Sequence, residues 1–255
     1  MVIDILTLSP SYFASPLQEG MIHRGIEKGL VRVRIFNLRE FALDRHRTVD
    51  DRPFGGGPGM VLKPDPIVRA LNFLQGIPPR RPYSILLTPR GRPLDQRILK
   101  KIAAQGRLIL ICGRYEGVDE RVGAYYCRDQ ISIGDYVLSG GEPAALVMLD
   151  GVVRLIPEVL GSSESIDQES HEDYLLEYPQ YTRPGNFENH KVPDILLNGN
   201  HEQIRRWRRQ ESLSGTRAVR PELLDKAILN EEDLVFLALT KEASQKRPDH
   251  RKRKH

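Results

Sequence analysis

Three glycine-containing segments, each following a short apolar stretch, have residue types that could hold a ligand. They read SILLTPRGRPLD at 84–95, LILICGRYEGVDERV at 108–122 and QISIGDYVLSGGEPAAL at 130–146. Glycine lets the backbone approach a ligand closely, so the N–H and C=O groups of such loops can read the edge of an adenine. Acidic side chains there can hold ribose hydroxyls or face a sulfonium charge. None of the segments matches the glycine patterns of dinucleotide or ATP sites.

The elements that position these loops follow from the apolar pattern. Short stretches rich in Val, Ile and Leu predict strands of a covered parallel sheet at 2–8, 31–37, 84–88, 108–112 and 130–133. Helices are predicted at 10–28, 66–74, 95–104 and 141–149. This alternation predicts an α/β fold class. Because ligands bind beyond the carboxyl ends of strands in open α/β sheets, the three loops are expected to form one pocket.

The pattern also predicts the domain organisation. Residues 1–160 form the α/β domain, and the polar stretch 161–173 is a flexible linker or lid. Residues 174–245 are expected to form a small all-helical domain, followed by a basic tail at 246–255. Its helices are predicted at 201–213, with Asn200 as the N-cap, and at 221–229 and 231–241.

Composition limits the class of protein. The chain has 255 residues and a net charge of +4, and no run of about 18 apolar residues predicts a membrane span. The first ten residues do not have the pattern of a signal peptide. Two cysteines exclude a disulfide framework and favour a cytoplasmic protein, and without CxxC or HExxH motifs a zinc site is not expected.

A basic stretch lies on the predicted helix 201–213, where Arg205, Arg208 and Arg209 fall on roughly one face near Trp207. Basic side chains with an aromatic ring can grip the backbone of RNA and stack a base. A solvated basic face above a buried tryptophan is the alternative, and the two are compatible.

Three motifs taken together carry a family resemblance: GRYEGVDER at 113–121, SIGDYVLSGGEPAAL at 132–146 and RLIPEVLG at 154–161. They resemble the TrmD family, the bacterial tRNA (guanine-37-N1)-methyltransferases of the SPOUT class. The stretches DRHRTVDDRPFGGGPGMVLKPDP at 44–66 and YPQYTRP at 178–184 agree. The resemblance covers nearly the whole chain, apart from the last dozen residues.

The resemblance implies methyl transfer from S-adenosylmethionine to N1 of guanine 37 in the anticodon loop of tRNA. It implies a deep trefoil knot near 85–140, a homodimer whose active sites combine both subunits, and dependence on magnesium. No cluster of metal ligands is evident in the sequence, so no metal residue is assigned. The cofactor residues carried over by the resemblance are Thr88, Pro89, Gly113, Tyr115, Glu116, Gly117, Ser132, Ile133, Gly134, Asp135, Tyr136, Val137, Leu138, Gly140 and Gly141.

Methyl transfer to guanine N1 requires a general base that removes the proton of N1. It also requires a cation beside O6 that stabilises the negative charge on that oxygen. By resemblance the cation is Arg154. The family usually has Asp-Ser-Phe in the lid, whereas this chain has Glu-Ser-His, so Glu169 stands at the position of the aspartate. His171 and Asp167 are alternative bases.

The resemblance also places residues near the tRNA. The glycine-rich stretch 52–60 is expected close to the target guanine and the dimer interface. The tRNA-binding candidates are His46, Asp50, Arg52, Gly55, Gly57, Arg183, Arg205, Arg208 and Arg209.

Three other functions fit the sequence less well. An RNA-binding protein without methyl transfer predicts a degenerate cofactor pocket, but all three loops are intact. Another knotted methyltransferase, acting on ribose 2′-OH or on ribosomal RNA, does not need a lid carboxylate aimed at a base nitrogen. A nucleotide-dependent dehydrogenase requires fingerprint glycines that are missing here.

Overall fold

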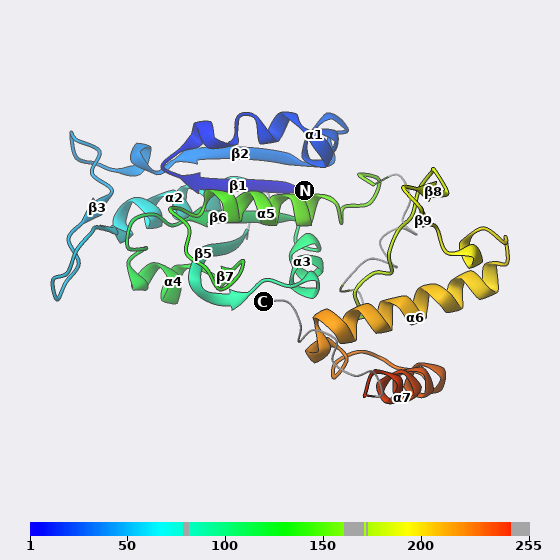
Figure 1. Ribbon diagram of the computed structural model, residues 1–255. Helices are drawn as coiled ribbons and strands as arrows, with labels where there is room; N and C mark the ends of the chain where they lie inside the picture. The colour runs from blue at the N-terminus through cyan, green and yellow to red at the C-terminus, as the bar shows by residue number, and fades with distance from the viewer. Residues whose placement is uncertain (79–81, 161–170, 172, 246–255) are drawn as a thin grey trace. The chain divides into compact units, whose positions relative to one another are not determined.

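The computed structural model describes residues 1–78, 82–160, 171 and 173–245 (Figure 1). The chain divides into two compact units, residues 1–163 and 164–255. Glu169, Asp167, most of the predicted lid and the predicted basic tail lie outside the described residues. Within the described residues, no helix is both long and apolar enough to cross a membrane.

The first unit is built on a parallel sheet of strand order β2-β1-β6-β5-β7, which confirms the predicted α/β class. Every predicted strand is present. Their bounds are β1 Val2–Thr7, β2 Arg32–Asn37, β5 Tyr83–Pro93, β6 Arg107–Cys112 and β7 Asp129–Ser132. Two short antiparallel strands, β3 Asp50–Asp51 and β4 Val61–Leu62, form a separate pair.

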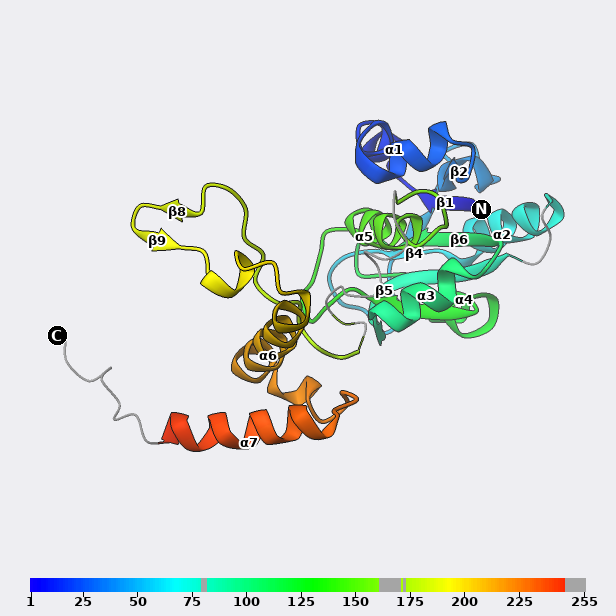
Figure 2. The same ribbon diagram turned by 90° about the vertical axis from the view of Figure 1, so that its right-hand side faces the viewer.

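Helices cover both faces of this sheet (Figure 2). One face packs against α1 Gly20–Glu27, α3 Gln96–Ala103 and α5 Glu142–Val153. The other face packs against α2 Pro64–Gly76 and α4 Glu120–Tyr126. The strands are apolar on both sides because both of their faces are buried, as expected for a covered parallel sheet.

Strand β1, which lies between β2 and β6, carries one buried charge. Asp4 is fully buried and accepts hydrogen bonds from Arg34 Nε at 2.5 Å and from Arg107 Nη2 at 2.6 Å. A carboxylate without such partners would cost several kcal/mol to bury. The two arginines lie on the neighbouring strands β2 and β6, so this cluster joins three strands.

One stretch of β5 contacts β7 twice. Leu87 and Arg92 both pair with Ile131, so the chain leaves the ladder at 88–91 and returns to it. Gly91 sits at the crossing, where a Cβ atom would come within 2.4 Å of the Ile131 nitrogen. Only glycine fits such a close backbone approach.

The predicted helix 10–28 is wrong in part. The segment instead forms two 3-10 turns, Pro10–Phe13 and Pro16–Gln18, before α1 begins. Pro16 interrupts the helix because proline lacks the N–H that a continuous helix would need. The short helix α4 was not predicted, since its seven residues lie inside a loop-like sequence.

The second unit contains α6 His201–Val219 and α7 Glu231–Gln245. Asn200 caps α6 as predicted, with its side chain accepting from Gln203 N at 3.2 Å. The unit is not all-helical, because β8 Asn186–Phe187 pairs with β9 His190–Lys191. The predicted helix 221–229 reduces to the 3-10 turn Pro221–Leu223.

Replacing Gly91 with alanine should destabilise the first unit, because the added methyl meets backbone that cannot rotate away. We expect Gly91→Ala to lower the free energy of unfolding by about 1–3 kcal/mol or more, measured by urea denaturation. The matched control is Gly76→Ala at the end of α2, where a Cβ meets nothing within 4 Å. Equal stability of the two variants would contradict a close crossing at Gly91.

Candidate functional site

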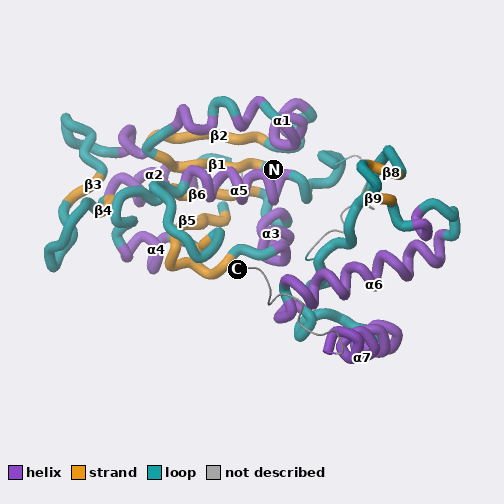
Figure 3. The backbone as a smooth tube through the Cα atoms, in the orientation of Figure 1, coloured by secondary structure: helices purple, strands orange, loops and turns teal. Residues whose placement is uncertain are grey.

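A cavity of about 300 Å³ lies at the carboxyl ends of β5, β6 and β7, where the sequence predicts a pocket. Figure 3 shows in teal the loops that follow β6 and β7. The predicted cofactor residues that line it are Thr88, Pro89, Gly113, Tyr115, Glu116, Gly117, Ser132, Ile133, Gly134, Tyr136, Val137, Leu138, Gly140 and Gly141. Asp135 is the predicted residue that does not line it.

Backbone contacts hold the loops around the cavity. Gly141 N donates to Gly113 O at 2.8 Å, and Arg114 forms a bridge with Gly140. A Cβ on Gly141 would lie 2.8 Å from Cys112 Cα, so glycine is required where the second and third loops meet. The cavity therefore depends on direct backbone contact between its loops.

Several side chains at the cavity stay exposed although they are large and apolar. Tyr115, Tyr136 and Val137 are 49%, 53% and 85% exposed. Tyr115 also has a left-handed backbone with φ of 62°, which is costly for a residue with a side chain. Exposed apolar side chains and local strain concentrated at a cavity are typical of a ligand or partner site.

The glycine-rich stretch 52–60 joins the cavity through its last residues. Glu116 N donates to Met60 O at 2.9 Å, and Leu62 N donates to Gly117 O at 2.9 Å. The predicted tRNA residues upstream, His46, Arg52, Gly55 and Gly57, are exposed, and Asp50 is half-buried in β3. The structure thus connects the predicted RNA segment to the second cofactor loop.

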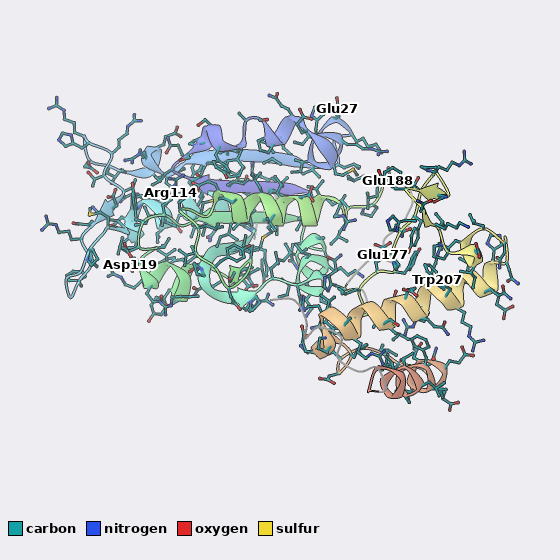
Figure 4. All side chains as sticks on the ribbon, viewed as in Figure 1. Glu27, Arg114, Asp119, Glu177, Glu188 and Trp207 are labelled. Carbon is teal, nitrogen blue, oxygen red and sulfur yellow. The ribbon has the colours of Figure 1, made fainter. Side chains whose placement is uncertain are left out.

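Glu142 is a residue of this site that the sequence reasoning missed. It is fully buried at the start of α5, and its Oε1 accepts from Thr7 Oγ1 at 2.6 Å and from Arg114 Nε at 3.1 Å. Arg114 lines the cavity (Figure 4). Oε2 of Glu142 is buried without a hydrogen-bond partner among the described residues. The sequence signal that could have identified Glu142 is an acidic residue at the first position of an otherwise apolar helix.

The catalytic candidate Arg154 is not among the residues that line this cavity. Arg154 is half-buried at the C-cap of α5, while Gly141 and Ala144 at the opposite end line the cavity. At the rise of an α-helix, the two ends are about 20 Å apart. Glu169 lies outside the described residues, and His171 is exposed in the second unit.

The basic residues of α6 do not form one stripe. Arg209 Nη2 donates to Asp233 Oδ2 at 2.8 Å, and this contact raises the pKa of Arg209 and ties α6 to the start of α7. Arg208 instead lies over the ring of Tyr178 and lines a different cavity from Arg205 and Arg209. Arg205 and Arg183 are exposed.

The thiols are poorly suited to nucleophilic chemistry. Burial raises the pKa of Cys127 to about 12 and raises that of Cys112 well above its usual value. A high pKa keeps a thiol protonated at neutral pH. Within the described part of the chain, no group of three or more His, Cys, Asp or Glu residues could hold a metal ion.

The chain is similar to known proteins over most of its length. Residues 1–226 match the family described as tRNA (Guanine-1)-methyltransferase TrmD. A protein of Dictyoglomus turgidum named tRNA (guanine-N(1)-)-methyltransferase is 52% identical over 235 residues, covering 92% of this chain and 94% of the relative. A protein of the same name from Gloeobacter violaceus is 54% identical over 225 residues, covering 88% and 98%. The chain therefore belongs to the TrmD family of tRNA methyltransferases.

Proposed function

We propose that this enzyme transfers a methyl group from S-adenosylmethionine to N1 of guanine 37 in the anticodon loop of tRNA. The observation that carries the proposal is the cavity at the ends of β5, β6 and β7, in a chain of this family. Curated relatives are named tRNA (guanine-N(1)-)-methyltransferase, which supports guanine N1 as the target atom.

The residues around the cavity suit the methyl donor. Its volume falls in the range of small-molecule sites, and its glycine loops offer backbone groups that can pair with an adenine edge. Glu116 and Glu120 line the cavity and can face the positive charge of a sulfonium. When bound there, S-adenosylmethionine supplies an electrophilic methyl, so the chain does not need a nucleophile of its own.

The other requirement of the reaction is removal of the proton from guanine N1. Glu169 is proposed to accept the proton of N1, and Arg154 to donate hydrogen bonds to O6 as negative charge spreads onto it. A glutamate is one methylene longer than the aspartate that the family usually has, and it keeps the carboxylate that acts as base. His171 and Asp167 remain the competing bases.

The separation along α5 supports a homodimer with composite active sites. Since Arg154 lies about 20 Å from Gly141 on the same helix, it cannot reach the cavity of its own chain. A second copy can bring its Arg154 to that cavity. We therefore propose that each site uses the cofactor loops of one protomer and Arg154 of its partner.

The proposed knot is supported by the irregular pairing of β5 with β7, in which Leu87 and Arg92 both pair with Ile131. The proposal also includes a cytoplasmic location and a dependence on magnesium, whose ligands are not assigned.

Methyl transfer to defined transcripts tests the reaction. Labelled methyl from S-adenosylmethionine should appear on a tRNA transcript with guanine at position 37 and not on one with adenine there. The label should map to N1, and removing magnesium with a chelator should lower the rate. Label on neither transcript, with the donor shown to bind, would assign the cavity to a different RNA substrate.

The identity of the base is tested by comparing variants of the lid. Glu169→Gln removes the carboxylate base and should slow methyl transfer by at least about 10²-fold, while donor binding measured by calorimetry is retained. The matched control is His171→Gln, which should transfer methyl at a rate close to that of the unaltered protein. A slow His171 variant beside a fast Glu169 variant would assign the proton transfer to the histidine.

The composite site is tested by complementation between two inactive variants. Leu138→Trp fills the cavity, and Arg154→Ala removes the cation, so each homodimer should be inactive. A purified heterodimer of the two should regain up to about half of the unaltered activity, because one of its sites combines an intact cavity with an intact Arg154. A heterodimer as inactive as its parents would show that both groups act within one chain.

A further inference from the structure

The second unit contains a cavity of about 430 Å³ between α6 and the stretch 178–197. Three aromatic residues line it: Tyr178, Tyr181 and Trp207. We propose that this cavity receives an unpaired base of the RNA substrate other than the base that is methylated. The inference rests on the proposed function, since it takes tRNA as the substrate.

The aromatic side chains are arranged for stacking. The ring centroids of Tyr181 and Trp207 are 6.4 Å apart at an interplanar angle of 49°. The side chain of Tyr181 is 48% exposed, so its ring is open to a ligand from outside. Figure 4 labels its neighbour Trp207 on α6. Unpaired RNA bases are commonly recognised by stacking on aromatic side chains or on arginine planes.

Arg208 forms another flat surface of the same cavity. Its Cζ lies 4.7 Å from the centroid of the Tyr178 ring, which holds the guanidinium in place. The Nε atom of Arg208 is buried and has no hydrogen-bond partner within the residues that the structure describes. A stacked guanidinium with an unused donor is suited to a base, whose face it can cover and whose edge can accept hydrogen bonds.

Charge at this cavity favours an anionic partner such as RNA over a basic or neutral one. Among the described residues that line the cavity, the charged ones are Arg183 and Arg208, and none is acidic. The cavity between α6 and α7 differs, because Glu202, Glu231, Glu232 and Asp233 line it beside the arginines. A phosphate attached to a stacked base would therefore meet only positive charge at the first cavity.

Trp207 provides a direct readout, because it is the one tryptophan of the chain. Titrating the full-length protein with a tRNA transcript should quench its fluorescence as a base stacks against the aromatic cluster. Unchanged emission, while a filter-binding assay shows that the tRNA is bound, would overturn the inference. A change with protein concentration in the absence of RNA would assign the cavity to contact between copies of the chain, and would also overturn it.

The variants use Tyr181 because it is exposed and its loss should spare the fold. Tyr181→Ala should weaken tRNA binding about tenfold, whereas Tyr181→Phe keeps the ring and should bind within about twofold of the unaltered protein. Phe187→Ala is the matched control, since it removes an exposed aromatic that does not line the cavity. Equal binding by the alanine and phenylalanine variants of Tyr181 would contradict stacking.

The base itself is identified with synthetic tRNAs that each lack one unpaired base. One abasic position other than 37 should abolish the quenching of Trp207 and weaken binding by the same factor as Tyr181→Ala. Combining that tRNA with the variant should give no further loss, as expected when both changes remove one contact. Additive losses at every position would reject the assignment.

Methyl transfer by the unaltered protein separates this inference from the proposed function. If guanine 37 is methylated while Trp207 does not respond to bound tRNA, the base cavity alone is wrong. If no guanine is methylated while tRNA quenches Trp207 in the pattern described, the proposed reaction alone is wrong.

Discussion

The close passage of β5 against β7 is the constraint on which the rest of the first unit depends. Leu87 and Arg92 pair with the same residue, Ile131, and Gly91 leaves no room for a side chain at the crossing. This passage places the start of one loop of the cavity beside the start of another. A sheet of the same strand order without it would keep its core but would separate the walls of the cavity.

A buried carboxylate connects this region to the middle of the sheet. Glu142 links Thr7 at the end of β1 with Arg114 in the loop after β6, and it stands at the start of α5. Its negative charge is favourable at a helix N-terminus and is further stabilised by Arg114. The loop after β6 is therefore held by polar contacts of Glu142 inside an apolar core. Hydrogen bonds are more directional than apolar packing, so these contacts fix the position of the loop more closely.

Local sequence patterns were sufficient to predict the strands and the three loops. Apolar runs and glycines indicate the conformation of only a few neighbouring residues, and strands and loops are features of that length. They did not reveal the partners of Glu142 or Arg209, since those contacts join residues 135 and 24 positions apart in the chain. The broken helix before α1 was missed because the apolar pattern continued across Pro16. The separation of Arg154 from the cavity became evident only when the length of α5 was known.

The hydrogen bond between Glu116 N and Met60 O has a consequence for the order of events at the site. It joins a loop that lines the cavity to the exposed glycine-rich stretch, so the two cannot move independently. A ligand that shifts one of them changes the affinity of the other for its own ligand, and thermodynamic linkage makes that effect equal in both directions. The proposed docking of tRNA at the stretch 52–60 would thereby be coupled to occupancy of the cavity.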